Sequence, residues 1–451
     1  MSILDDSDLQ KVKVQSLSNY NVITQEYVYS NIKGTINISS NNIKSYIETE
    51  TLTDTEYKKQ IYNIAKKIVN INYKLDYDYV NLINQNEKNL TDANIDRYNF
   101  AWVKKLGHAI LNYCEIWIGG HSIDKQYGQW LDIWWEMSGN KYQEKNYMEM
   151  IGNISELTTF DSSIKPEYTL YIPLQFWFCR HISLALPTIA MNSSDIIFKF
   201  HFRKFSELSY TDFPYQTYDD NNNLVTNGTL DNIINEKDLH MNVTLLLEII
   251  YLDTIERQKF ARSSHEYLIE QVQYNTEKTT LNYTLSYNLN FRHPCKGIIW
   301  IIQKQNNLTN TDNTNECLWT TYTLDNPEYK ENNNILKKIN PLISANLIID
   351  NISISDYDIN YYNYLEPNRV FKNSPENGIN SYWFSLFPEK IEPSGSCNLS
   401  IIKNIRLEYK FNSLIVDNDI ENLQETYIVN FYALNYNILR ISSGIANVAY
   451  I

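Results

Sequence analysis

Cysteine and histidine stand two residues apart at two places in the sequence, Cys179 with His181 and His293 with Cys295. In an extended strand, residues i and i+2 point to the same face, so each pair could bind one metal ion. A structural zinc site needs four ligands, and neither pair has two further ligands at a suitable spacing. We therefore predict no metal site and interpret these cysteines as packed thiols.

Two other patterns resemble catalytic sites. Residues 394–397 (SGSC) offer nucleophiles, but they follow Pro393 and precede an expected strand, which favours a turn. The pair Asp76 and Asp78 could act as the acid and base of a glycosidase, yet nothing apolar surrounds it to raise a pKa. The motifs GxSxG, GxGxxG and the P-loop are absent from the sequence. We predict that the chain is not an enzyme, with no catalytic residues and no cofactor.

The charge of the chain argues against a nucleic-acid binder. Its 53 acidic and 39 basic residues give a net charge of −14, whereas phosphate binding requires a basic surface. The five cysteines are scattered without CxxC spacing, which favours reduced thiols in a cytosolic setting. The start, MSILDDSDLQ, lacks secretory-signal features, and no apolar run reaches the ~20 residues of a membrane span. We expect a soluble protein made in the cytosol.

The composition favours β-structure, because tyrosine, isoleucine, valine and threonine pack well on a pleated sheet, and 36 residues are tyrosine. Alternation of apolar and polar residues locates the expected strands. They lie at residues 22–29, 34–38, 100–118, 168–178, 195–205, 243–252, 268–274, 280–289, 297–303, 382–387, 401–411 and 427–434.

Three segments predict helices. Apolar residues recur at spacings of three and four over residues 54–67. Residues 127–137 (YGQWLDIWWEM) place Trp130 and Trp134 on one helical face, which we expect to pack on a sheet. The charged segment 254–266 is also helix-like, and we place the domain boundary within it.

Polar segments rich in asparagine and aspartate interrupt this pattern. We expect polar insertions at about 51–98 and 211–239, and long loops at 306–334 and 350–380. Two sets of strands joined by long loops indicate two β-sandwiches. The predicted fold is all-β, with domains at 1–260 and 261–451.

The aromatic run Phe176-Trp177-Phe178 lies in one of the expected strands. Aromatic side chains most often fill a core, but they also form sugar-stacking platforms and interface anchors. Neighbouring side chains of a strand point to opposite faces. At least one of these rings should therefore face something other than the core of its own domain.

Six blocks of the sequence resemble the major capsid proteins of nucleocytoplasmic large DNA viruses. They are LGHAILNYCEIWIGGHSIDKQYGQWLDIWWEM (106–137), LYIPLQFWFCRHISLALPTIAM (170–191), YLDTIERQKFARSSHEYLIEQVQ (251–273), FRHPCKGIIWIIQ (291–303), PSGSCNLSIIKNIRL (393–407) and NYNILRISSGIANVAY (435–450). The resemblance implies two tandem eight-stranded jelly-roll β-sandwiches with short helices and long loop insertions.

The resemblance also implies a function. Members of this family form homotrimers that act as pseudo-hexagonal capsomers of an icosahedral shell. The implied partners are the chain itself, neighbouring capsomers, and minor capsid and penton proteins, with the internal viral membrane contacted indirectly and nucleic acid not contacted. The implied location is the virion capsid, assembled in the host cytoplasm.

From the matching blocks we select twelve candidate residues for structure and assembly. They are Trp130, Trp134, Phe176, Trp177, Phe178, Pro187, Pro294, Trp300, Pro393, Gly395, Asn435 and Tyr436. Three alternatives stay open at this point: a minor capsid or scaffold paralogue of the same fold, a carbohydrate-binding β-sandwich, and a glycan-acting enzyme on the same scaffold.

Overall fold

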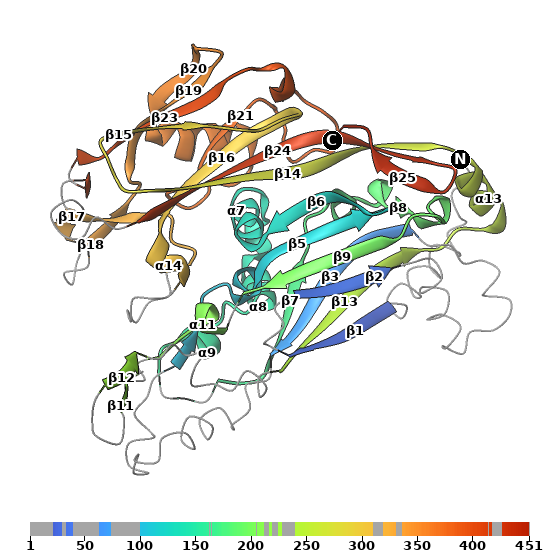
Figure 1. Ribbon diagram of the computed structural model, residues 1–451, viewed down its shortest axis with the longest axis horizontal. Helices are drawn as coiled ribbons and strands as arrows, with labels where there is room; N and C mark the ends of the chain where they lie inside the picture. The colour runs from blue at the N-terminus through green and yellow to red at the C-terminus, as the bar shows by residue number, and fades with distance from the viewer. Residues whose placement is uncertain are drawn as a thin grey trace.

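The computed structural model (Figure 1) describes residues 21–28, 33–38, 63–73, 100–161, 163, 165–203, 205–211, 216–218, 224–227, 240–309, 319–330, 336–413, 415–416 and 426–450. Among these residues, strands form two sandwiches that follow one another along the chain. The C-terminal sandwich lies above the N-terminal one in Figure 1. Short helices lie in the connections.

The first sandwich consists of two facing sheets with the strand orders β1-β13-β3-β7 and β2-β9-β5-β6. Every pairing is antiparallel. The strands are β1 (Asn21–Val28), β2 (Lys33–Ile38), β3 (Asn63–Tyr73), β5 (Leu111–Ile118), β6 (His121–Tyr127), β7 (Tyr168–Pro173), β9 (Ile196–Phe202) and β13 (His240–Ile250). If these eight are numbered in chain order, the two sheets read 1-8-3-6 and 2-7-4-5, which is the jelly-roll order.

The second sandwich repeats this order. Its sheets are β14-β24-β16-β21 and β15-β23-β19-β20, which again read 1-8-3-6 and 2-7-4-5. The strands are β14 (His265–Thr279), β15 (Thr284–Asn288), β16 (Pro294–Lys304), β19 (Leu342–Ile349), β20 (Ile352–Asp358), β21 (Asn380–Trp383), β23 (Ile405–Phe411) and β24 (Tyr427–Ser442). The fold is therefore all-β with two tandem jelly rolls, and that prediction is confirmed.

Smaller strands extend or flank the sheets. They are β4 (Phe100–Trp102) with β10 (Ser209–Thr211), β11 (Gln216–Tyr218) with β12 (Leu224–Asn227), β17 (Leu324–Lys330) with β18 (Leu336–Ile339), and β8 (Leu186–Pro187), β22 (Cys397–Asn398) and β25 (Ile445–Val448) at the edges of larger sheets. The main helices are α6 (Leu106–Ala109), α7 (Gly128–Ser138), α8 (Glu144–Met150), α9 (Ser155–Thr158), α10 (Trp177–Arg180), α11 (Phe205–Leu208), α13 (Thr254–Arg262), α14 (Gln305–Thr309) and α15 (Glu366–Val370), with a π-helix at Tyr361–Leu365.

Most expected elements are present, including the helices at 127–137 and 254–266, which are α7 and α13. The expected strand at 168–178 ends at Pro173, and residues 177–180 form the helical turn α10 instead. Proline provides the reason, since it has no N–H with which to continue a ladder. The expected strand at 100–118 begins only at Leu111, after β4 and α6.

The predictions for residues 51–98 and 350–380 are wrong in part. Residues 63–73 form β3, which pairs with β13 inside the first sandwich, where we expected a helix and then an insertion. A spacing of four residues is shared by one face of a helix and one face of a strand, so it did not distinguish them. Residues 352–358 form β20, which escaped detection because both of its faces carry polar residues.

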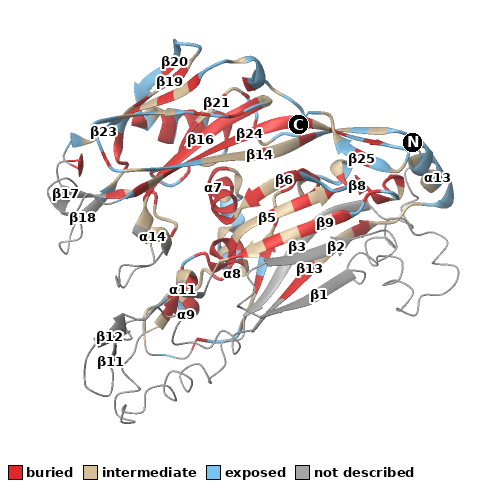
Figure 2. Cartoon of the chain, in the orientation of Figure 1, coloured by how far each residue is buried: buried red, intermediate tan, exposed pale blue. Residues whose placement is uncertain are grey.

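Two apolar cores hold the molecule together. One lies inside the second jelly roll and contains Trp300, Tyr409 and Phe431. The other fills the first jelly roll and continues, without interruption, into the contact between the two jelly rolls, where it takes in Tyr432 and Trp383 of the second. Figure 2 shows this buried zone running through α7, β5, β16 and β24. The two jelly rolls are therefore packed as one body.

Candidate functional site between the two jelly rolls

Helix α7 lies in the contact between the jelly rolls and is buried almost all round, apart from Trp135 and Ser138. Its apolar face includes Trp130 and Trp134, as predicted. Trp130 packs against Tyr432 of the second jelly roll, with ring centroids 5.7 Å apart, and Trp134 packs against Phe371 at 5.9 Å. The second jelly roll therefore covers the face of α7 that an isolated sandwich would expose.

The covered face of α7 carries polar groups at helical spacing: Gln129, Asp132 and Glu136 are all buried. Lys105 Nζ lies 2.8 Å from Asp132 Oδ1 and 2.8 Å from Glu136 Oε1. Tyr322 of the second jelly roll donates its hydroxyl to Asp132 Oδ2 at 2.7 Å. Buried charges require such partners. The carboxylate of Asp132 thus joins both jelly rolls.

The charge states in this cluster follow from burial and pairing. Burial alone would lower the pKa of Lys105, but attraction to Asp132 and Glu136 outweighs it and the pKa is raised. Burial would likewise raise the pKa of Asp132, but Lys105 and His108 hold it below its ordinary value. Both groups are charged at neutral pH, and they form an ion pair.

His108 completes the cluster as a neutral side chain, because burial lowers its pKa against the opposing pull of Asp132. Its Nδ1 lies 3.4 Å from Asp132 Oδ1, and its Nε2 lies 2.8 Å from Tyr147 Oη. The carboxylate is an acceptor only, so Nδ1 carries the hydrogen and Nε2 accepts from the tyrosine hydroxyl. Both ring nitrogens of His108 are hydrogen-bonded within the protein, so neither is available to exchange a proton with a ligand.

A second polar group, made of amides, lies on the same helix. Gln129 Oε1 accepts from Asn430 Nδ2 at 2.7 Å and from Tyr432 Oη at 2.8 Å, and its Nε2 donates to Gln303. Gln303 in turn donates to the backbone oxygen of Trp319 at 2.8 Å. Gln129 belongs to the first jelly roll and its partners to the second. This network fixes the position of one relative to the other.

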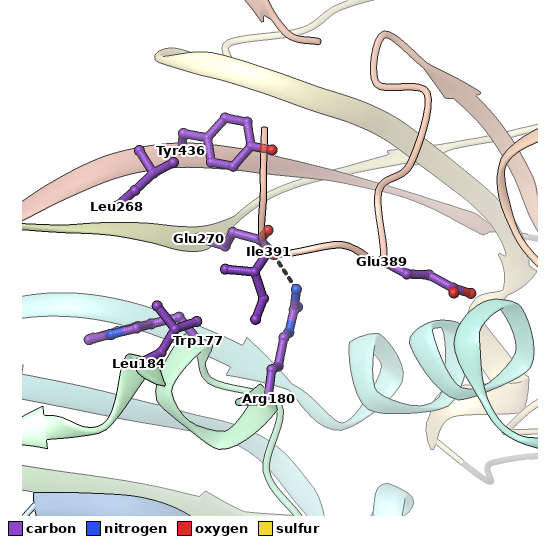
Figure 3. A pocket seen from close by; sticks show the side chains of 8 residues that line it. All are labelled: Trp177, Arg180, Leu184, Leu268, Glu270, Glu389, Ile391 and Tyr436. Atoms are coloured by element: carbon purple, nitrogen blue, oxygen red, sulfur yellow. Dashed lines mark hydrogen bonds and ion pairs between the residues drawn. The ribbon is translucent and has the colours of Figure 1, made fainter. Parts of the chain in front are cut away.

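A third connection joins Arg180 of α10 to Glu270 of β14 (Figure 3). Lys296 also donates to Glu270, with Nζ 2.6 Å from Oε1. Burial lowers the pKa of Lys296, and Glu270 counteracts this. Trp177 and Tyr436 line the hollow beside this group, where the free space is about 10 Å³. That volume admits about one water molecule, so the hollow does not accommodate an organic ligand.

A fourth connection is Asp124 of β6, which accepts from the backbone N–H of Val272 in β14 at 2.9 Å and from Gln126 at 3.0 Å. Burial raises the pKa of Asp124 to about 7, although these N–H donors oppose the change. The charge of this carboxyl therefore changes near neutral pH.

We expect Asp124→Asn to remove a pH dependence of stability. The folded pKa of about 7 exceeds the unfolded value of ~3.9, so the folded state holds the proton more tightly. The protonated Asp124 carboxyl stabilises the folded state fully at pH values below the pKa of the unfolded state. This stabilisation is lost as the pH rises through the pKa of the folded state. The free energy of unfolding of Asp124→Asn minus that of the unmodified chain should thus grow by roughly 1–3 kcal/mol between about pH 5 and pH 8. Urea unfolding at a series of pH values measures it, and a constant difference would contradict the assignment.

The structure brings some of the twelve candidate residues together and separates others. The contact between the jelly rolls contains Trp130, Trp134, Trp177 and Tyr436. Asn435 lies in β24 and accepts a hydrogen bond from Gln273 of β14, within the second jelly roll. Phe176 and Phe178 pack with Phe198 inside the first jelly roll, and Trp300 packs with Tyr362 and Tyr409 inside the second. Pro187 lies in β8, Pro294 begins β16, and Pro393 and Gly395 lie in the irregular segment before β22.

Gly395 illustrates a local backbone requirement. Its φ is +125°, and an added Cβ would lie 2.7 Å from the backbone oxygen of Phe384. Only glycine adopts this conformation without strain. Residues 393–396 are irregular backbone that leads into β22, which begins at Cys397, and Ser394 Oγ is hydrogen-bonded to Ser385 Oγ at 2.7 Å. The hydroxyl is a structural hydrogen-bonding group.

The side chains of residues 176–178 point in two directions, as expected, but they do so from a helical turn and not from the expected strand. Phe176 and Phe178 point into the first core, whereas Trp177 lies in the hollow beside Tyr436 of the second jelly roll. A helical turn, not a strand, produces this divergence.

Sequence reasoning missed the buried ionic and amide groups. The available signal was the stripe Gln129, Asp132 and Glu136 at spacings of three and four in a helix that also carries three tryptophans. Such a stripe is normally a solvent-facing surface. Here residues of both jelly rolls cover it: Lys105 and His108 from the first, and Tyr322 from the second.

Among the described cysteines, Cys114 and Cys295 are buried and Cys179 and Cys397 are partly buried. Cys295 is buried, and burial raises its pKa to about 12. Within the described ranges, no three or more His, Cys, Asp or Glu side chains are grouped so as to hold a metal ion. In that same part of the chain, no helix is long and apolar enough to cross a membrane.

Both halves of the chain are similar to known proteins. The sequence profile described as large eukaryotic DNA virus major capsid protein matches residues 256–447, and the one described as major capsid protein N-terminus matches residues 78–253. The major capsid protein of Phaeocystis pouchetii virus is 28% identical over 442 residues, covering 77% of this chain and 82% of that protein. Probable capsid protein 4 of Acanthamoeba polyphaga mimivirus is 27% identical over 454 residues, covering 83% and 86%.

Solved structures agree on the fold. The PBCV-1 protein VP54 superposes with a TM-score of 0.67 at 21% identity, covering 96% of this chain and 97% of that one. The Faustovirus major capsid protein gives a TM-score of 0.60 at 11% identity, covering 94% and 91%. The two profiles meet at the start of α13, where the first jelly roll ends and the second begins. The chain therefore belongs to the major capsid protein family of the large eukaryotic DNA viruses.

Proposed function

We propose that this chain is a structural major capsid protein whose copies associate into a homotrimer that forms a pseudo-hexagonal capsomer, many of which tile an icosahedral shell. The observation that carries this proposal is the repeated strand order of two jelly rolls packed as one body. Three such chains supply six similar jelly rolls, and closed rotational symmetry makes a finite block. The twelve candidate residues then act by setting the shape of that block.

The role is that of a building block and not of an enzyme. The buried titratable groups of the contact pair with each other, and the hollow beside Trp177 admits only about one water molecule. A net charge of −14 disfavours direct contact with nucleic acid. We propose neighbouring capsomers, minor capsid proteins and penton proteins as partners, with the internal membrane contacted indirectly. The chain would act in the virion capsid after assembly in the host cytoplasm, with domains at 1–260 and 261–451.

The test is the mass of the purified chain in solution. Three chains of 53.2 kDa form a particle of about 160 kDa, which size-exclusion chromatography with light scattering resolves from a monomer. Negative-stain images should show hexagonal outlines. A monomer at all concentrations would overturn the proposal. High copy number in purified particles, read from a stained gel, separates a major capsid protein from a minor or scaffold paralogue.

A further inference from the structure

Two cysteines of the second jelly roll lie directly opposite each other on neighbouring strands. Cys295 is the second residue of β16, Cys397 is the first residue of β22, and the antiparallel register pairs the two. Both are free thiols in the structure. They are far apart in the sequence, so the tertiary structure brings them together.

The spacing of this pair suits a disulfide bond. Opposite residues of an antiparallel ladder have Cα atoms about 4.5–5.5 Å apart, and a disulfide joins Cα atoms about 4.4–6.8 Å apart. Opposite side chains also point to the same face of the sheet. Here that face is the core of the second jelly roll, since Cys295 belongs to this core and Cys397 packs against it. One S–S bond can therefore join the two sulfur atoms.

The other contacts of the pair do not prevent such a bond. Cys295 donates its thiol hydrogen to the backbone oxygen of Gly297, with the sulfur and the oxygen 3.1 Å apart. A thiol is a weak donor, so the loss of this hydrogen bond costs little. Among the residues that the structure describes, no third ligand joins the pair to hold a metal ion. The chemistry open to the pair is oxidation to a disulfide.

The two thiols differ in their access to solvent. Cys295 is 0% exposed, whereas Cys397 is partly buried, so an oxidant in solution reaches Cys397 first. Burial raises the pKa of both thiols, to about 12 for Cys295. Since the thiolate is the reactive form, the oxidation is slow at neutral pH and faster at alkaline pH.

The bond would anchor a long irregular segment of the second jelly roll. Residues 384–396 connect β21 to β22 without a helix or a strand, and β22 itself adds only two residues to the sheet. The segment carries Glu389 and Ile391, which line the hollow between the jelly rolls (Figure 3). A bond from β22 to β16 would therefore hold part of the contact between the jelly rolls in place.

We propose that Cys295 and Cys397 form a disulfide bond once the chain has left the reducing cytosol, so that the bond is absent during synthesis and present in the released particle. Disulfides persist outside the cell and are rare in the cytosol. The position of the bond follows from the register of β16 and β22. Its timing rests on the proposed function as a virion protein assembled in the host cytoplasm.

A small-molecule disulfide such as oxidised glutathione is the oxidant. The Cys397 thiolate attacks one sulfur of the oxidant, which breaks the S–S bond of the oxidant and releases one thiolate. The Cys295 thiolate then attacks the sulfur of Cys397, forms the new S–S bond and releases the second thiolate. The two protons that the cysteines lose end on the two released thiols. Two cysteines are oxidised, and one external disulfide is reduced.

The first experiment looks for the bond in the purified full chain. After incubation with oxidised glutathione at mildly alkaline pH, alkylation and proteolysis, mass spectrometry should find the peptide of Cys295 joined to that of Cys397. Cys397→Ser should abolish this species. The matched control is Cys179→Ser, which changes another partly buried cysteine, in α10, and should retain it. Recovery of Cys295 and Cys397 as separate peptides from the oxidised chain would overturn the proposed bond.

The second experiment measures stability. The bond closes a loop of about 100 residues, and by restricting the unfolded chain it should raise the melting temperature by roughly 5–10 °C over that of the reduced chain. Cys397→Ser should show no such rise. Light scattering on the same samples separates the two proposals. An intact trimer without the bond would overturn the disulfide alone, whereas a linked chain that stays monomeric would overturn the proposed function alone.

The third experiment tests the timing of the oxidation. Released particles that are alkylated before they are opened should yield the linked peptides. Newly made chain, alkylated as infected cells are lysed, should yield Cys295 and Cys397 on separate peptides. Linked peptides in the newly made chain, or separate peptides in the released particles, would overturn the proposed timing.

Discussion

Replacing Asp132 by alanine should lower the free energy of unfolding by about 3–5 kcal/mol, because it removes one of the two carboxylates that pair with the buried ammonium of Lys105 and leaves only Glu136. Lys105 is 7% exposed at its side chain and lies 2.8 Å from Asp132. Tyr322 and His108 would lose an acceptor at the same time. Urea unfolding at one fixed protein concentration measures the change.

A triple variant supplies the control for this prediction. Lys105→Met with Asp132→Leu and Glu136→Gln removes all three buried charges of the cluster, which should recover much of the loss. A loss below about 1 kcal/mol for Asp132→Ala alone would contradict the pairing, since surface ion pairs contribute no more than that.

Replacing Trp177 by alanine should also destabilise the chain by roughly 3–5 kcal/mol, the range for a large aromatic removed from a packed interior. Trp177 is 1% exposed, and its ring meets that of Phe178 edge-on at 4.8 Å. The loss should appear in the melting temperature of the monomer, because a single chain already buries the ring.

Tyr142→Ala is the comparison for Trp177→Ala. Tyr142 is fully exposed, and its removal should change the stability by less than about 0.5 kcal/mol. A Trp177→Ala chain that melts normally but no longer forms trimers would instead assign the ring to contacts between subunits. If stability and trimer were both intact, Trp177 would have neither role.

Much of the strand pattern could be predicted from local sequence. Residues 196–202 alternate between buried and half-buried, and α7 shows its apolar face at helical spacing. These signals are local because side-chain direction repeats every two residues in a strand and every 3.6 in a helix. Strand β20 gave no such signal: Ile352 and Ile354 share a strand with two serines and two aspartates, and only one of its residues is buried.

The candidate site was predictable only in its aromatic part. Trp130, Trp134 and Trp177 stand out by residue type, and the structure places them in the contact between the jelly rolls. The polar part could not be found in the same way. Asp132 meets Tyr322 across 190 residues of sequence, and Gln129 meets Asn430 across 301.

The sequence by itself determined that the chain forms two sets of antiparallel strands and belongs among the capsid proteins, because alternation and motif blocks are written in neighbouring residues. The tertiary structure decided which surfaces are interior. The helix face that bears Asp132 and Glu136 is buried because Lys105 and His108 pack on it from the first jelly roll and Tyr322 packs on it from the second. Ile123 of β6 and Ile354 of β20 are each the third residue of the second strand of a hairpin with a two-residue turn, yet Ile123 is 3% exposed and Ile354 is 45% exposed. Burial depends on what packs from elsewhere in the fold, and local residue patterns do not contain that information.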